Sequence, residues 1–270
     1  MIPAPFTYRW RVRLSDEVTS LVLLADTHCG SRLSVAPSGV EFEGGTLCGL
    51  SESSKALHDY WNMCWDEYLP LYHEEGELAV IHVGDVVDGS KYPSQLYSPD
   101  EVDQVELATE LLRPIVEMAD SFHLIRGTDA HDGKEGCAAE NVAARLGLRR
   151  RHGIRCPYVL DLHWRGLQIH LAHQRSAGGM YKHRALEQEM KLTRETSPKV
   201  DIIVRAHAHT FVYNRDRQGH AIGLPAWKTP GPHLHQGSLK NVVPDIGMVL
   251  LTLDEEDGLH VVPFVDTLGC

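Results

Sequence analysis

The chain has 270 residues, of which 43% are hydrophobic and 23% charged, and a formal net charge of −11 at pH 7. This length and composition predict one globular domain over residues 1–270 with a sizeable core. The acidic balance argues against a generally basic nucleic-acid-binding surface. It does not exclude a nucleic-acid substrate, because bound metal cations can supply local positive charge.

The first half of the chain alternates apolar runs with helical patterns. The runs at 19–26, 77–85 and 121–127 are short, nearly continuously apolar and typical of strands buried on both faces. Between them, a helical segment is expected at about 50–75, and a second helix near Ser98, with Ser98 as the N-cap of a capping box. This β-α-β-α-β order indicates a largely parallel sheet.

The second half has a different pattern. Two hairpins are expected, one from the runs 158–162 and 167–172 and one from 247–253 and 259–265. A helical stretch near 181–194 and a strand at 200–206 lie between them. We therefore predict an α/β fold with two mixed sheets packed face to face and helices outside, a four-layer αββα sandwich.

Aspartate and histidine residues follow each predicted strand. The groups are Asp26-Thr27-His28, Gly84-Asp85-Val86-Val87-Asp88, Gly127-Thr128-Asp129-Ala130-His131, Ala172-His173 and His207-Ala208-His209. Because ligands gather at the carboxyl ends of strands in open α/β sheets, these side chains are expected to converge. In D-x-H and H-x-H, an extended backbone would point both side chains the same way. Mixed Asp and His ligands suit Mn²⁺, Fe or Zn²⁺ better than Ca²⁺ or Mg²⁺.

The order D-x-H, G-D-x-x-D, G-T-x-x-H, a lone His and then H-x-H resembles the calcineurin-like metallophosphoesterase superfamily. The Leu-Pro-Ala-Trp segment at 224–227 and the final strand that begins with Pro-Asp-Ile-Gly at 244–247 resemble phage and prophage members. The resemblance implies the same αββα sandwich and two divalent metal ions, with Mn²⁺ preferred and Fe, Zn²⁺ or Ni²⁺ as alternatives.

The resemblance also assigns ligands by motif. Asp26, His28 and His209 would hold one metal, Asp85 would bridge, and His173 and His207 would hold the second. The ions of such centres lie roughly 3.5–4 Å apart and lower the pKa of a water that attacks phosphorus.

One motif departs from the family. Most members have Gly-Asn-His after the third strand, where Asn is a ligand and His protonates the leaving group, whereas this chain has Thr128 at the Asn position. We expect His131 to recover a role there, as general acid or as ligand, with Asp129 as the competing ligand. Thr128 itself is a further candidate for metal or substrate.

Other polar residues beside the motifs could have either a structural or a functional role. Asp88 is expected to accept hydrogen bonds within its loop rather than to bind metal. Arg126 and Arg175 are candidates for pairing with phosphate, or equally with carboxylates such as Glu140. A second H-x-H, at 233–235, is expected not to ligate because no strand precedes it.

The sequence thus predicts a dinuclear metal-dependent phosphoester hydrolase, by resemblance a phosphodiesterase acting on nucleic acid or a nucleotide. A phosphomonoesterase and a non-catalytic metal-bound scaffold are the alternatives. The cysteines lack C-x-x-C spacing, the N-terminal residues lack a signal peptide, and no apolar run is long enough to cross a bilayer. We therefore expect a cytoplasmic protein without a membrane partner.

Overall fold

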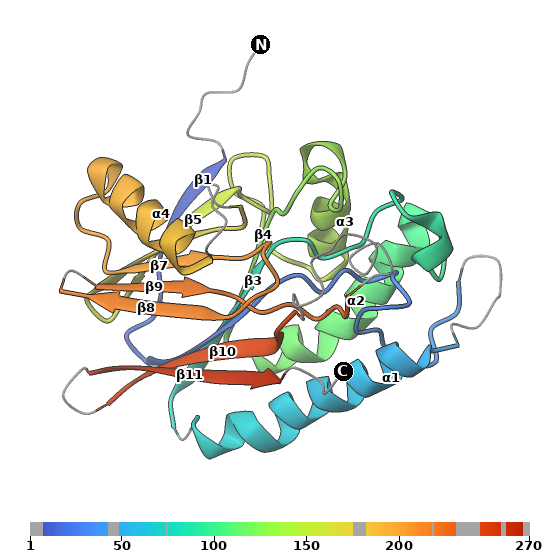
Figure 1. Cartoon of the computed structure of the whole chain (residues 1–270), viewed down its shortest axis with the longest axis horizontal. Helices are drawn as coiled ribbons and strands as arrows, with labels where there is room; N and C mark the ends of the chain where they lie inside the picture. Colours follow the sequence, from blue (N-terminus) through green and yellow to red (C-terminus); the bar gives the residue numbers. More distant parts are fainter. Residues whose placement is uncertain are drawn as a thin grey trace, which may run out of the picture.

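The computed structural model describes residues 8–42, 49–73, 75–174, 182–217, 219–230, 244–254 and 258–266. Two sheets form the body of the molecule, and helices lie on their outer sides (Figure 1). Within the described residues, the structure has no helix of the length and apolarity that a bilayer-spanning segment requires.

The first sheet has five strands in the order β11-β10-β2-β3-β4. Their bounds are β2 Val18–Leu24, β3 Glu77–Val83, β4 Ser121–Ile125, β10 Ile246–Leu253 and β11 Leu259–Asp266. Strands β2, β3 and β4 are parallel, and the hairpin β10–β11 joins them antiparallel. The parallel first half and the last hairpin predicted from the sequence are confirmed.

The second sheet has six strands in the order β1-β5-β6-β7-β9-β8. Their bounds are β1 Arg9–Arg13, β5 Val159–Trp164, β6 Leu167–Ala172, β7 Ile202–Arg205, β8 Val212–Asp216 and β9 Gly219–Gly223. The predicted β5–β6 hairpin is confirmed. The sequence did not predict β1, which pairs parallel with β5, or the hairpin β8–β9.

Helices cover both outer faces of the paired sheets. The α-helices are α1 Glu52–Asn62, α2 Glu101–Met118, α3 Cys137–Arg145 and α4 Lys182–Thr196. A π-helix at Met63–Tyr68 and a 3-10 turn at Leu69–Leu71 continue α1, and shorter 3-10 turns lie at Pro93–Gln95 and Lys134–Gly136.

Three apolar clusters fix the order of the layers. One lies between α1, α2, α3 and the first sheet, a second lies between the two sheets, and a third joins α4 to the second sheet. Alternation along β2 explains this: Val22 and Leu24 face the helices, while Leu21 and Leu23 face the second sheet. The predicted four-layer αββα arrangement is therefore confirmed.

The start of α2 differs from the expectation. Asp100, not Ser98, is the N-cap, and its carboxylate accepts the N–H of Val102 (2.9 Å). Ser98 Oγ instead accepts the N–H of Asp100 (3.2 Å), one step earlier. The capping box was wrong because Pro99 lies before the helix, and a carboxylate at the N-terminus also complements the helix dipole.

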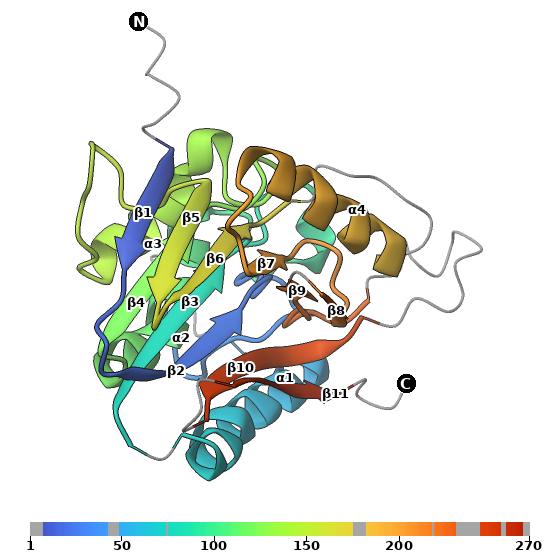
Figure 2. The ribbon, with the colours of Figure 1, turned by 90° about the vertical axis from the view of Figure 1, so that its left-hand side faces the viewer.

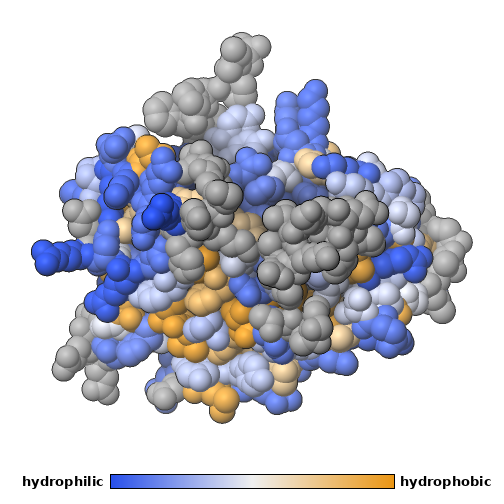
Figure 3. Space-filling model, viewed as in Figure 1, coloured by the Kyte–Doolittle hydropathy of each residue, from blue (hydrophilic) through white to orange (hydrophobic). Residues whose placement is uncertain are grey.

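The coloured part of the face seen in Figure 3 is mostly hydrophilic. In the view of Figure 3, hydrophobic residues gather in the lower centre, where Figure 1 places β10.

Candidate metal centre

Five strand ends meet where the two sheets open toward solvent. Strands β2, β3 and β4 of the first sheet are followed by Asp26, Asp85 and Thr128, and β6 and β7 of the second sheet by His173 and His207. Residues as far apart in the chain as His28 and His209, which are separated by 181 positions, are brought into contact in this way. The convergence expected from the motif order is what the structure contains.

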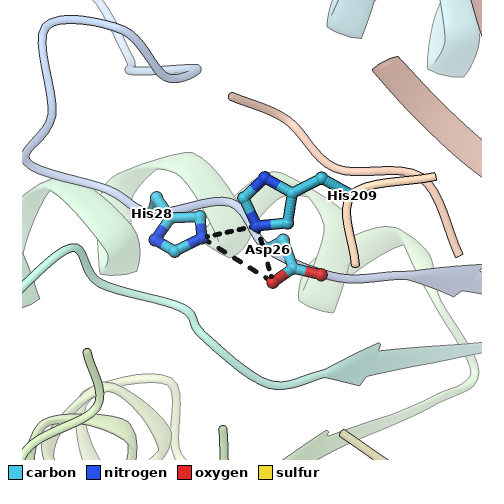
Figure 4. Close-up of side chains that lie close together, drawn as sticks. All are labelled: Asp26, His28 and His209. Atoms are coloured by element: carbon cyan, nitrogen blue, oxygen red, sulfur yellow. Dashed lines mark hydrogen bonds and ion pairs between the residues drawn. The ribbon is translucent and has the colours of Figure 1, made fainter. Parts of the chain in front are cut away.

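The first group of side chains is Asp26, His28 and His209 (Figure 4). The Nε2 atoms of the two histidines lie 3.1 Å apart. Asp26 Oδ1 lies 3.6 Å from His28 Nε2 and 3.3 Å from His209 Nε2. All three side chains thus present a ligand atom to one small space.

The second group is Asp85, His173 and His207. Asp85 Oδ2 lies 3.1 Å from His173 Nε2 and 3.9 Å from His207 Nδ1. His173 Nδ1 donates to the carbonyl of Val83 (2.7 Å), which fixes the tautomer and leaves Nε2 free to bind a metal when the ring is neutral.

The two groups adjoin each other through Asp26. Its Oδ1 is 3.9 Å from His173 Nε2, so this single oxygen approaches histidines of both groups. Asp85 directs Oδ2 to the second group, whereas its Oδ1 accepts two hydrogen bonds from Thr128, from N (2.6 Å) and from Oγ1 (3.0 Å). Thr128 therefore orients the Asp85 carboxylate, a role that its motif position alone did not indicate.

The backbone at these residues is strained. Five candidate ligands have positive φ: Asp26 55°, His28 44°, Asp85 53°, His207 67° and His209 49°. The expectation of extended D-x-H and H-x-H segments is wrong, because left-handed turns and not strand alternation aim these side chains. Such conformations cost roughly 1–3 kcal/mol per residue and cluster at functional sites.

The buried carboxylates of the site carry negative charge that cations would compensate. Asp26 Oδ1, Asp85 Oδ2 and His173 Nε2 are buried and have no hydrogen-bond partner within the described residues. Burial opposes ionisation, yet His209 and His173 lower the pKa of Asp26, and His173 lowers that of Asp85, well below the usual range. Burial likewise acts against the charge of His173, but the two carboxylates raise its pKa to about 9. A proton on His173 thus compensates where a metal ion would, and the residues fit a divalent cation.

A third group, His28, Asp88 and His131, adjoins the first. Asp88 Oδ1 lies 3.0 Å from His28 Nδ1, and the same oxygen pairs with Lys228 Nζ. A carboxylate behind a ligating histidine fixes the ring and raises its basicity. His131 Nδ1 donates to the Asp88 carbonyl (2.6 Å), and burial, followed by the charge of His28, lowers the pKa of His131 to about 4.

Asp132 organises the loops beneath the site, a role that the sequence did not indicate. It is fully buried, and its carboxylate accepts the N–H groups of Gly127 (2.6 Å), Val86 (2.8 Å) and Asp85 (3.2 Å). Burial and then the charge of Asp85 raise its pKa to about 7. In the sequence, Asp132 is marked only by being an acidic residue directly after the third motif, which ends at His131.

An open cleft of about 710 Å³ lies beside the second group, lined in part by Lys91, Thr128, Asp129, His131 and Tyr158. Asp129 is exposed and belongs to none of the three groups. Arg126 borders the cleft, but its guanidinium is buried and donates to Glu140 Oε1 (2.9 Å) and the Cys156 carbonyl (2.6 Å). Arg175 and the H-x-H at 233–235 lie outside the described residues.

No protein-family model matches the chain, and no curated protein matches it. Among solved structures, it is similar to Vps29 complexed with zinc from Entamoeba histolytica (11% identity, TM-score 0.45, covering 91% of this chain and 99% of that one). It is also similar to an archaeal phosphodiesterase (12%, 0.42, 90% and 99%) and to a predicted phosphoesterase from Streptococcus pneumoniae (10%, 0.39, 92% and 98%). At these values the likeness says nothing about activity, and the phage-type resemblance gains no support from it.

Proposed function

We propose that this chain is a phosphodiesterase that depends on two divalent cations and acts on nucleic acid or a nucleotide. The observation that carries the proposal is the set of three buried ligand atoms without hydrogen-bond partners, Asp26 Oδ1, Asp85 Oδ2 and His173 Nε2, in one strained cluster. Leaving such atoms unsatisfied is costly unless a cation completes them.

Asp26, His28 and His209 would hold one cation, and Asp85, His173 and His207 the other, with Asp26 Oδ1 near both. Bound cations of this kind supply a water of lowered pKa and stabilise charge on a phosphoryl oxygen. Manganese, which the motif resemblance implies, is the first metal to test, and iron, zinc and nickel are the alternatives for a mixed imidazole and carboxylate donor set.

His131 would act on the leaving group. Its ring lines the cleft, and the bond from Nδ1 to the Asp88 carbonyl orients Nε2. Burial keeps the free ring neutral near pH 7, but an adjacent phosphate anion favours the protonated form, which could then donate a proton to the departing oxygen.

A diester is preferred over a monoester because of the cleft. Its volume of about 710 Å³ and its open form accommodate a substrate that continues on either side of the phosphate. Lys91 and Tyr158 are available there for contacts with charge and with a base or sugar.

The rival proposal is a metal-bound scaffold without turnover. Thr128 supports it, because a hydroxyl engaged with Asp85 is not available as a ligand, which leaves three protein side chains for the second cation. A count near one metal ion per chain would favour the scaffold, and a count near two would favour the enzyme.

The test compares hydrolysis of bis(p-nitrophenyl) phosphate with that of p-nitrophenyl phosphate after reconstitution with Mn²⁺. We expect turnover of the diester in the wild type and at least about a hundredfold loss in Asp85→Asn. Asp66→Asn is the matched control, since this exposed carboxylate lies on the π-helix at Met63–Tyr68, outside both the cleft and the ligand groups. Turnover of the monoester alone would overturn the diesterase proposal, and turnover of neither ester would favour the scaffold.

A further inference from the structure

Strand β1 carries a row of arginines at the edge of the second sheet. Trp10 and Val12 of β1 are buried in the core between the sheets, so Arg9, Arg11 and Arg13 lie on the opposite, outer face. The side chains of Arg11 and Arg13 are 78% and 77% exposed. Helix α4 packs on β7, β8 and β9, and Figure 2 shows β1 at the far edge of the sheet. Only the C-terminal end of α4 comes near β1, where Arg9 donates to Ser197 Oγ (3.3 Å).

Two hollows flank this row and add further cations. One, of about 410 Å³, is lined by Arg9, Arg11 and Lys199, and the other, of about 320 Å³, by Arg9, Arg11, Arg151 and His152. Arg151 also lies over the Trp10 ring, 5.6 Å from its centroid. We call Arg9, Arg11, Arg13, Arg151 and Lys199 together the basic strand face.

Carboxylates neutralise only part of this face. Asp161 forms an ion pair with Arg9 (2.6 Å) and lies 3.9 Å from Arg11, and Asp16 lies 3.6 Å from Arg13. Five cations thus face two carboxylates, in a chain whose formal net charge is −11. A local excess of this sign on an acidic molecule attracts and orients an anionic partner.

The basic strand face begins at the rim of the metal cleft. Val159 and Tyr158 line the cleft, and in the sheet Val159 pairs with Arg9 while the Tyr158 N–H donates to the Tyr8 carbonyl (2.8 Å). The rings of Tyr8 and Tyr158 lie 5.4 Å apart. From there β1 leads away from the cleft, so that Arg13 lies about 13 Å beyond Arg9, at ~3.3 Å per residue.

We infer that the basic strand face binds the sugar-phosphate backbone of a nucleic-acid strand whose scissile phosphate lies at the metal centre. This inference rests on the proposed function. It adds that the rest of the substrate strand runs along β1, away from the cleft. Arginine suits this role because its guanidinium donates two parallel hydrogen bonds to a phosphate. The row from Arg9 to Arg13, about 13 Å long at ~3.3 Å per residue, can contact successive phosphates of one strand.

The test uses Arg11→Gln/Arg151→Gln and a control of equal charge, Arg215→Gln/Arg217→Gln. Arg215 lies on β8, the opposite edge strand of the same sheet, and both control arginines are exposed. The probe is a fluorescein-labelled oligothymidylate of about twelve nucleotides with phosphorothioate linkages, whose binding is followed by anisotropy with Mn²⁺ at about 50 to 200 mM salt.

We expect about tenfold weaker binding in Arg11→Gln/Arg151→Gln and less than about twofold in the control. The slope of log affinity against log salt should fall by about 1.4, which is ~0.7 for each lost phosphate contact to a single strand. With a cleavable oligonucleotide, KM should rise about tenfold while kcat and turnover of bis(p-nitrophenyl) phosphate stay unchanged, because the small ester cannot reach β1.

Equal losses in both double variants, or no loss in either, would overturn the inference. It would also be overturned if Arg11→Gln/Arg151→Gln lost binding only to phosphatidylglycerol vesicles, since the face would then serve a lipid surface. The proposed function fails separately: arginine-dependent binding of the oligonucleotide without hydrolysis of any ester would support the binding face and refute the hydrolase.

Discussion

The two sheets contribute to the metal centre in different ways. The first sheet supplies Asp26, His28 and Asp85 on buried loops fixed by backbone hydrogen bonds, with Asp132 beneath them. The second sheet supplies one buried side chain, His173 at 2% exposure, and two more exposed ones, His207 at 50% and His209 at 27%. The first-sheet residues and His173 are therefore built into the fold, whereas the loop with His207 and His209 closes over them from the surface. Stability and metal affinity should separate along this line.

The largest effect is expected for Asp132→Ala. It leaves the buried N–H groups of Gly127, Val86 and Asp85 without their acceptor, at ~1–3 kcal/mol each, so the free energy of unfolding should fall by about 4 kcal/mol. Urea denaturation measures this. A loss below about 1 kcal/mol would show that the first-sheet loops do not depend on this carboxylate.

A second, smaller effect is expected for Gly127→Ala. A Cβ there would lie 2.1 Å from both N and Oδ1 of Asp85, so the two loops must separate, at a cost of about 3 kcal/mol. Gly49→Ala is the control, because a Cβ at that position meets nothing within 4 Å. Thermal unfolding of the two variants side by side checks the difference, and similar midpoints would contradict it.

Thr128→Val tests the link between the first-sheet loops and the second group. The substitution keeps the shape and the N–H bond to Asp85 but removes the Oγ1 bond, so we expect a loss of about 1 kcal/mol in stability. Affinity for Mn²⁺ should fall several-fold as the carboxylate gains freedom. Unchanged affinity, measured by calorimetric titration, would mean that the backbone bond alone positions Asp85.

The smallest effect on folding is expected for His207→Ala. This variant should also show the largest difference between its effect on stability and its effect on metal binding. Because its side chain is half exposed, removing it should change metal-free stability by less than about 0.5 kcal/mol. Stabilisation by Mn²⁺, about 2.7 kcal/mol at a hundredfold excess over Kd, should nevertheless be largely lost. Thermal unfolding with Mn²⁺ and with a chelator gives both numbers. Retention of the full Mn²⁺ effect would exclude His207 as a ligand.

Sequence patterns were sufficient for the layers and for most of the convergence. Apolar runs such as Val18–Leu24 have lengths typical of buried strands, and polar residues at the ends of parallel strands must meet at one edge. The edge strand Arg9–Arg13 was not predicted, because its three arginines leave only Trp10 and Val12 as apolar residues and so no continuous apolar run. Asp100 and not Ser98 is the N-cap, because the helix begins at Glu101 and Asp100 has the extended backbone that precedes a helix. The sequence alone does not fix that starting residue.

Within the site, the sequence pointed to the side chains that converge but not to the way in which they are aimed. Asp26 and His28 were expected on an extended backbone, whereas tertiary contacts hold both in left-handed conformations. Asp132 escaped notice because two of its three amide partners, those of Asp85 and Val86, lie more than forty residues away, which no local pattern encodes. The role of Thr128 likewise depends on the position of Asp85 across the interface of two loops.

The bond from His173 to the Val83 carbonyl joins the last residues of one sheet to the other. Any sliding of the sheets by about an ångström would exceed hydrogen-bond length and change the 3.1 Å separation of His173 and Asp85. The separation of the side chains that would hold the two proposed cations therefore depends on the thickness and stiffness of the apolar layer containing Ile81 and Leu171. A change of volume in that layer, remote from any ligand, would act on the metal centre as a mechanical displacement.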